Sequence, residues 1–267
     1  MKYDAQILLN RLVHVLSQFD GVECITLNEA AIPASLDPYF ALILDVFCNG
    51  EIPQAAEREK IFSKDDSSEN KISSFETYGE KDRFKDRFLY ADIPVHIEYK
   101  ATKKIESLID IAEKGKETLW LVKDSGTYGY YRLSEGEVLF TRGGWLENIR
   151  NRLNKLGNSF WVSMRQSSQS KMEHFLIDLG AALIQGDNFF YEMSAAGFIK
   201  NACLTLFCIN KQFEPSHRAY YKYVTSLPIL SEAFSAQLET FLRNDSETTP
   251  QRRYSIAQVI AKGIVVL

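Results

Sequence analysis

Residues 39–48 constrain the fold more than any other stretch, because they form a nearly unbroken apolar run in which Asp45 is the one charged residue. In a strand, successive side chains point to opposite faces, and here both alternate sets are apolar. That pattern is typical of a strand buried on both faces, at the centre of a sheet. The Asp45 carboxylate therefore has to be paired, hydrogen-bonded or bound to a metal, because a bare buried carboxylate costs several kcal/mol.

The composition is that of a soluble globular protein. The chain has 267 residues, 45% of them hydrophobic and 25% charged, which is enough for one large domain or two modest ones. A net charge of −4 argues against a general nucleic-acid-binding or membrane-surface protein. No apolar run reaches the length of a membrane span, and the amphipathic start of the chain does not resemble a signal peptide. We therefore expect a cytoplasmic protein.

The four cysteines are scattered along the chain, with no C-x-x-C pair and no spacing typical of zinc ligands. A cysteine pattern of this kind indicates reduced, buried thiols. It agrees with the expected cytoplasmic location and gives no support to a zinc site.

The first part of the chain alternates helical and strand patterns, which predicts a mixed sheet with flanking helices. We expect helices over 3–19 and 102–114. Strands are expected over 22–27, 39–48, 84–90, 93–100 and 119–122, with a small closing hairpin over 130–133 and 137–140. Residues 51–82 interrupt this order, because they are polar and charged with few large apolar groups. They predict a flexible surface excursion, with residues 63–74 poorly ordered or loosely packed.

After Gly143-Gly144 the period of the apolar residues changes from 2 to 3.6. Residues 189–209 are apolar on nearly all sides, as in the central helix of a bundle. Helices are expected over 145–156, 158–184, 187–210, 216–226, 228–243 and 249–262. The fold class is therefore predicted as α+β, with a mixed-sheet domain over 1–143 and an all-α bundle domain over 144–267.

The strand over 93–100 carries a polar face. His96, Glu98 and Lys100 alternate with Val95, Ile97 and Tyr99, so three polar groups point together from one strand. Two interpretations stay open for each acid. Asp45 is either a structural acid that accepts backbone N–H groups or a metal ligand. Glu98 belongs either to a solvated strand face or to a site.

This arrangement resembles the nucleotidyltransferase superfamily with the DNA-polymerase-beta-like fold. The resemblance lies in an acid on a central strand, a second acid on a later hairpin strand, and a carboxy-terminal helical bundle. Within the superfamily, the chain is most similar to the kanamycin-nucleotidyltransferase-like proteins. Residues 203–230 also resemble the helix–loop–helix of such proteins, where an asparagine and aromatic residues precede a helix rich in tyrosine and lysine.

The resemblance implies that a nucleotidyl group passes from a nucleoside triphosphate to a hydroxyl of a small molecule or a protein. In this family, carboxylates hold Mg²⁺, which bridges the triphosphate and offsets the charge that develops during transfer. By position, Asp45 resembles one acid of the strand pair and Glu98 the third acid, so these two are the implied catalytic and metal-binding residues. His96, Lys100 and Lys222 are the implied nucleotide-binding residues.

Two features depart from the family pattern. The positions two residues before and after Asp45 hold Ile43 and Phe47, and neither side chain can bind a metal. The Gly-Ser loop that would hold phosphate is also missing, because no glycine lies between Gly21 and Gly50. Both departures weaken the case for metal-assisted transfer.

Two functions therefore stay open, an active nucleotidyltransferase and an inactive relative that serves as a ligand-binding or regulatory module. The missing acid and loop favour the second function, and the polar face of 93–100 slightly favours the first. Glu29 or Asp37 could replace a missing metal ligand. The tyrosines of 220–223 either stack on a nucleotide or belong to the core of the bundle.

Overall fold

The structure is a computed structural model that describes residues 5–28, 41–63, 72–90, 92–114, 126–243 and 248–267. Contacts between Cα atoms divide the chain into two compact units. The first unit comprises Met1–Lys116 and Gly129–Lys155, and the second comprises Glu117–Tyr128 and Leu156–Leu267. The chain is α+β, as predicted from its sequence, since a mixed sheet is followed by a helical region.

The first unit is built on one mixed sheet of six strands in the order β3-β4-β5-β2-β1-β6. The strands are β1 (Val22–Leu27), β2 (Leu42–Cys48), β3 (Ile72–Glu80), β4 (Arg83–Tyr90), β5 (Ile93–Ala101) and β6 (Glu137–Thr141). Strands β2 and β5 are parallel, and the other neighbours are antiparallel. The apolar run thus forms a central strand, which confirms the prediction for residues 42–48.

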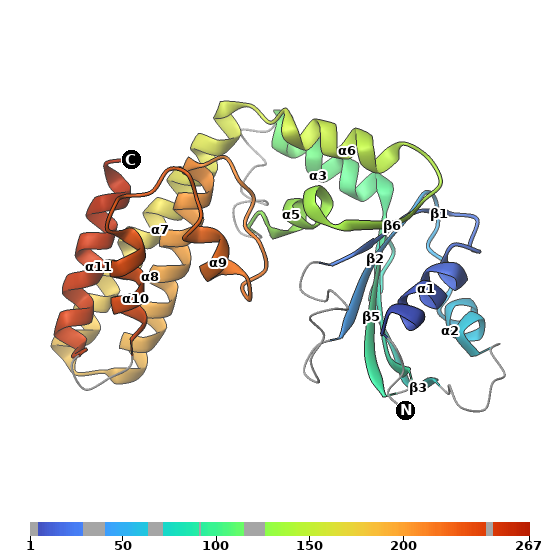
Figure 1. The fold of residues 1–267 in the computed structure, drawn as a ribbon, viewed down its shortest axis with the longest axis horizontal. Helices are drawn as coiled ribbons and strands as arrows, with labels where there is room; N and C mark the ends of the chain where they lie inside the picture. The colour runs from blue at the N-terminus through green and yellow to red at the C-terminus, as the bar shows by residue number, and fades with distance from the viewer. Residues whose placement is uncertain (1–4, 29–40, 64–71, 91, 115–125, 244–247) are drawn as a thin grey trace. The chain divides into compact units, whose positions relative to one another are not determined.

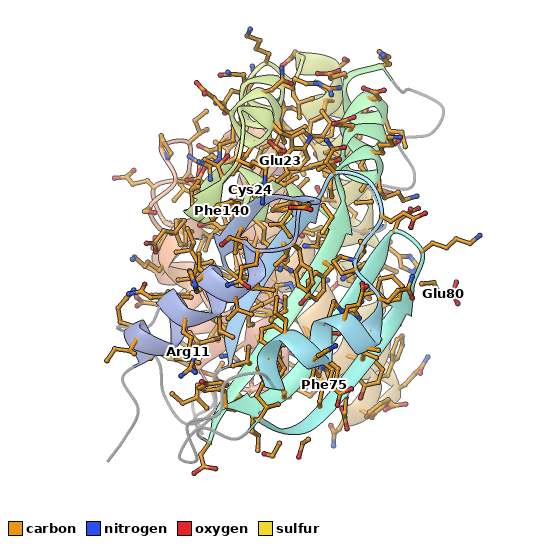
Figure 2. The ribbon with its side chains drawn as sticks, turned by 90° about the vertical axis from the view of Figure 1, so that its right-hand side faces the viewer. Arg11, Glu23, Cys24, Phe75, Glu80 and Phe140 are labelled. Atoms are coloured by element: carbon orange, nitrogen blue, oxygen red, sulfur yellow. The ribbon has the colours of Figure 1, made fainter. Side chains whose placement is uncertain are left out.

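Helices α1 (Ala5–Leu16) and α2 (Ala55–Ser63) cover one side of this sheet (Figure 1). Figure 2 views the sheet from that side and shows both helices lying across the strands. The core between them includes Leu12 of α1, Leu44 of β2 and Ile97 of β5, all 2% exposed or less. Because side chains alternate along a strand, the neighbours of these residues on β2 and β5 point to the opposite face.

Three further helices complete the first unit, namely α3 (Thr102–Lys114), α5 (Tyr128–Glu135) and α6 (Trp145–Asn154). Helix α3 follows β5 directly and packs against α6. In α6, Trp145 donates a hydrogen bond of 2.8 Å to Glu106, and Arg152 pairs with Asp110 and Glu113. These contacts fix α6 within the unit that contains the sheet.

The described elements of regular secondary structure in the second unit are all helices. It contains α7 (Asn158–Gln185), α8 (Asn188–Ile209), α9 (Tyr220–Val224), α10 (Phe234–Leu242) and α11 (Pro250–Val265). Helix α7 ends at Gly186 in the left-handed conformation, and Asp187 caps α8 by accepting a hydrogen bond from the Phe190 N–H. These elements confirm the predicted helices after residue 145.

Helix α8 is the core helix of this unit. Its Phe198 and Leu206 are fully buried and pack in one cluster with Phe241 of α10 and Ile260 of α11. Among the described helices, only α8 is long and apolar enough to cross a membrane, and 56% of its apolar window is buried inside the structure. Burial of that kind is typical of the central helix of a bundle.

The excursion predicted over 51–82 is wrong for its described residues, which form helix α2 and strand β3. Strand β3 is at the edge of the sheet and pairs with β4 alone, so its side chains can stay polar and exposed. Helix α2 is tied to the sheet by Arg58, which pairs with Asp86 at 2.8 Å, and by Phe62, whose ring centre lies 5.1 Å from that of Phe88 on β4. Of the segment 63–74, residues 64–71 lie outside the described residues.

The small hairpin predicted over 130–133 and 137–140 is also wrong. Its first arm is helix α5, where the Tyr130 hydroxyl donates a hydrogen bond of 2.9 Å to the Leu108 carbonyl. Its second arm is β6, which pairs with β1 and extends the main sheet. The strand predicted over 119–122 lies outside the described residues.

Candidate functional site

The two predicted acids face each other across the parallel pair β2 and β5. Asp45 is in register with Glu98, on the face of the sheet opposite α1 and α2. Both are buried, with Asp45 1% exposed and Glu98 4% exposed. The parallel register follows from the apolar alternation, because Leu44 and Ile97, which precede them, are paired in the core. The two acids that the sequence singled out therefore occupy one register position on neighbouring strands.

Lys100 and Arg132 lie between the two carboxylates. The Lys100 Nζ is 2.7 Å from Asp45 Oδ1 and 3.3 Å from Glu98 Oε2. The Arg132 guanidinium reaches both acids as well, with Nε 2.8 Å from Asp45 Oδ2 and Nη1 3.2 Å from Glu98 Oε2. Its Nη2 also contacts Asp45 Oδ1, which makes the pair bidentate. Each acid is therefore held by the same two cations.

Strand β4 supplies two more cations to Glu98. The Lys85 Nζ lies 3.1 Å from Oε1, and the Arg83 guanidinium lies 3.5 Å from Oε2. Lys85 is directly opposite Glu98 in the antiparallel register of β4 and β5. Unlike Lys100 and Arg132, these two side chains reach solvent, with 29% of Lys85 and 68% of Arg83 exposed. Within the described residues, four cations thus surround two carboxylates.

Three of these cations were missed in the sequence. Lys85 and Arg83 could have been found from the tight turn after Tyr90, which fixes the register of β4 and β5. Arg132 could not have been found in this way, because it lies 87 residues from Asp45 on a helix whose sequence pattern predicts a strand. Helix α5 is held in place by Arg150 of α6, which donates hydrogen bonds to the Leu133 and Gly136 carbonyls.

His96 shares the face of Glu98 and Lys100, as predicted, and lies opposite Arg87 of β4 and Ile43 of β2. Burial lowers the pKa of His96, and the nearby positive charges of Lys85 and Arg87 lower it further. The ring is therefore a neutral neighbour of the acidic pair at physiological pH, not a fifth cation.

Lys222, the other predicted nucleotide-binding residue, is on α9 in the second unit, where its Nζ lies 5.7 Å from the Tyr223 ring centre. Tyr220 packs edge-on against Phe207, and Tyr221 donates a hydrogen bond of 2.7 Å to Glu239. These contacts account for the aromatic residues of α9 by packing within the helical unit.

We expect Glu98 to contribute to the pH dependence of stability. Burial alone would raise the pKa of Glu98, but the charges of Lys100 and Arg132 and the hydrogen bond from Lys85 outweigh it and hold the pKa well below its usual range. The folded protein therefore keeps Glu98 charged where the unfolded chain binds a proton. This contribution is fully present above the unfolded pKa of about 4.3 and is lost as the pH falls below it.

Urea unfolding between about pH 3 and pH 7 measures this contribution, because it spans the unfolded pKa of glutamate. The wild-type free energy of unfolding should fall more steeply on the acid side than that of Glu98→Gln, which has no carboxyl to protonate. The exposed Glu51→Gln serves as the matched control and should follow the wild type. Parallel curves for Glu98→Gln and wild type would show that the ion pairs do not stabilise the fold.

The described residues do not by themselves fit a magnesium site. Mg²⁺ requires near-octahedral oxygen ligands, whereas the described residues contain no group of three or more His, Cys, Asp or Glu side chains placed to hold a metal. The oxygens of Asp45 and Glu98 accept from Lys100 and Arg132 instead. The candidate replacements Glu29 and Asp37 lie outside the described residues. Asp45 and Glu98 therefore form an ion-pair cluster, and their implied role in metal binding and catalysis stays a prediction.

The fold and the site together define an α+β protein with a mixed six-stranded sheet, a buried carboxylate pair at its centre and a helical second unit. No known protein family and no curated protein matches the sequence. Among solved structures, the chain is similar to a nucleotidyltransferase-like protein from Exiguobacterium sibiricum 255-15, with 13% identity and a TM-score of 0.48. The match covers 98% of this chain and 74% of that one. It points to neither a subfamily nor an activity.

Proposed function

We propose that the first unit is a metal-independent binding module for a nucleoside phosphate, and not a magnesium-dependent transferase. One observation carries this proposal, namely that cations of the protein hold the carboxylates of Asp45 and Glu98. Transfer of a nucleotidyl group depends on metal ions that bridge the phosphates and offset the charge in the transition state. Lys100 and Arg132 already neutralise both acids, so these carboxylates do not need Mg²⁺ to offset their charge.

The same cluster supports binding of an anion. Four cations against two carboxylates leave an excess of positive charge on this face, and Arg83 and Lys85 extend from it to solvent. Two exposed acids of β3, Glu76 and Glu80, lie opposite Arg87 and Arg83 and offset part of that excess. Arginine and lysine are the side chains that most often receive phosphate. A phosphate group is therefore the anion that this edge of the cluster suits best.

An aromatic side chain lies next to these cations. Tyr78 on β3 is opposite Lys85 and is 50% exposed, and the Arg87 guanidinium lies 5.6 Å from its ring centre. An exposed ring beside cationic side chains can stack on a base while the cations receive the phosphate. This combination favours a nucleoside phosphate over a free inorganic anion.

Calorimetric titration of the protein with ATP and GTP in the presence of EDTA tests the proposal. We expect binding without metal, weakened about a hundredfold or more in the double variant Arg83→Ala/Lys85→Ala, because charge-assisted hydrogen bonds contribute about 1.5–3 kcal/mol each. The exposed Lys104→Ala on α3 is the matched control and should bind like the wild type. Tyr78→Ala should weaken the binding of ATP and leave the binding of inorganic triphosphate unchanged.

The alternative is an active enzyme that transfers a nucleotidyl group to a hydroxyl of a small molecule or protein. It is favoured by one observation, the adjacency of two buried acids on parallel strands. An absence of triphosphate binding in EDTA, with binding restored by Mg²⁺, would favour this alternative and end the proposal.

A further inference from the structure

The second unit contains a cavity of about 230 Å³ between α7 and α8. At about 30 Å³ for each water-sized group, this volume has room for roughly seven or eight non-hydrogen atoms. Its lining includes Thr127, Ser167, Lys171, Lys200, Asn201 and Glu214. Met164, Phe175 and Leu204 add apolar surface to this lining. The cavity therefore combines charged and neutral polar groups with apolar side chains, which suits a small polar molecule with a short hydrocarbon chain.

Glu214 is the unusual member of this lining, because it is a carboxylate that is only 5% exposed. Its Oε2 accepts a hydrogen bond of 2.5 Å from the Tyr220 hydroxyl, and its Oε1 accepts one of 3.3 Å from the Tyr128 N–H. Burial and the negative charge of Glu214 raise the pKa of Tyr220, which keeps this hydroxyl a donor. Gly126 leaves room for the carboxylate, since a Cβ at that position would collide with Oε1.

Among the described residues, the charge of Glu214 has no partner of opposite sign. In the described part of the chain, Glu214 forms no ion pair, and both of its carboxylate contacts are with neutral donors. Buried charges are normally paired, because their desolvation costs several kcal/mol. Lys200 of α8 lines the same cavity, and among the described residues it forms no ion pair with Glu214. Two opposite charges that line one cavity without forming an ion pair can both be bound by a ligand that bridges them.

We propose that this cavity binds a small zwitterion, with an amino group on Glu214 and an anionic group toward Lys200. The amino group supplies the positive charge that the buried carboxylate lacks, and it can donate to the carboxylate oxygens alongside Tyr220. The anionic group is a carboxylate or a phosphate, both of which lysine receives. Amino acids and amino alcohol phosphates of about eight non-hydrogen atoms or fewer match the volume.

Glu214 also has a structural contact that the test must separate from ligand binding. Its backbone N–H donates a hydrogen bond of 2.9 Å to the Thr127 hydroxyl, and its side chain holds the Tyr128 N–H, so it fixes the segment 126–128. Glutamine can keep these contacts, because its carbonyl oxygen accepts from one donor and its amide can donate to the Tyr220 oxygen. Glu214→Gln therefore removes the negative charge and preserves the hydrogen bonds that fix the segment 126–128.

The test is calorimetric titration of the full chain with γ-aminobutyrate and with phosphoethanolamine, which represent the two anionic groups. Butylamine and butyrate are matched probes that carry one charge each. We expect at least one zwitterion to bind, and each single-charge probe to bind at least about tenfold more weakly, since a charged hydrogen bond contributes about 1.5–3 kcal/mol.

Three variants complete the test. Glu214→Gln should weaken zwitterion binding by about tenfold or more and Lys200→Ala by a smaller factor, while the exposed Lys262→Ala of α11 should bind like the wild type. Lys200 is exposed, so its variant keeps the test valid should Glu214→Gln unfold. The proposal would be overturned if neither zwitterion gave a heat of binding at a ligand concentration of about 10 mM. It would also be overturned if the protein bound the zwitterion and butylamine with equal affinity. Unchanged affinity in both Glu214→Gln and Lys200→Ala would overturn it as well.

Discussion

Replacing Asp45 with asparagine is expected to lower the free energy of unfolding by about 3–5 kcal/mol, the usual cost of breaking a buried ion pair from one side. The loss arises because Lys100 and Arg132, which are 16% and 11% exposed, keep their positive charges and lose one of the two carboxylates that they contact. The asparagine amide adds a donor where both neighbours are donors. Urea unfolding of the wild type and the variant measures the change.

The sign of this change separates the two interpretations of the site. Two carboxylates kept apart for a metal repel each other in the metal-free protein, so the removal of one would stabilise it. A cluster held by protein cations loses stability instead. Asp82→Asn, on the exposed turn between β3 and β4, is the control and should change stability by about 0.5 kcal/mol or less. In the double variant Asp45→Asn/Arg132→Met, the combined loss should be smaller than the sum of the single losses.

Replacing Arg58 with methionine should have a comparable effect, a loss of about 3–5 kcal/mol, because it leaves a buried acid unpaired. Arg58 is 1% exposed and holds the fully buried Asp86 with Nε at 2.8 Å and Nη2 at 2.9 Å. Its guanidinium also lies about 5 Å from the ring centres of Phe84 and Tyr99. The single variant therefore loses an ion pair and two cation–π contacts together.

Thermal and urea unfolding of Arg58→Met check this expectation. The double variant Arg58→Met/Asp86→Leu should recover much of the loss, because apolar groups of similar volume often replace a buried ion pair at little cost. Arg87→Met, an exposed arginine on the same strand as Asp86, should stay within about 0.5 kcal/mol of the wild type. A single variant as stable as Arg87→Met would show that Arg58 does not anchor α2 to the sheet.

The parts of the fold that follow from apolar periodicity could be predicted from the sequence. Strand β2 was predicted from its apolar run, and α8 was predicted from residues that are apolar on nearly all sides. Helix α2 and strand β3 were not predicted. Helix α2 is held by the buried pair Arg58–Asp86 and by Phe62 rather than by a regular apolar face, and β3 lies at the edge of the sheet. The periodicity of apolar residues indicates where apolar surface is buried. It does not detect an element that is anchored by a buried charge pair.

The candidate site could be predicted in part for a related reason. Asp45 and Glu98 were found because each is an acid at a position where the strand pattern requires an explanation, and they are indeed in register. The contact of Arg132 with these acids could not be predicted, because Arg132 belongs to α5, whose sequence pattern predicts a hairpin arm. Without Arg132 the two acids resemble a metal site, and with it they become an ion-pair cluster.

The magnesium dependence of triphosphate binding tests this central claim most directly. Calorimetric titration of the protein with a non-hydrolysable nucleoside triphosphate, once in EDTA and once in excess Mg²⁺, gives both affinities on the same sample. The account predicts that the triphosphate binds at least as tightly in EDTA, because Mg²⁺ neutralises the charge that Arg83 and Lys85 would receive. Binding that appears only with Mg²⁺, and that disappears in Asp45→Asn, would contradict it.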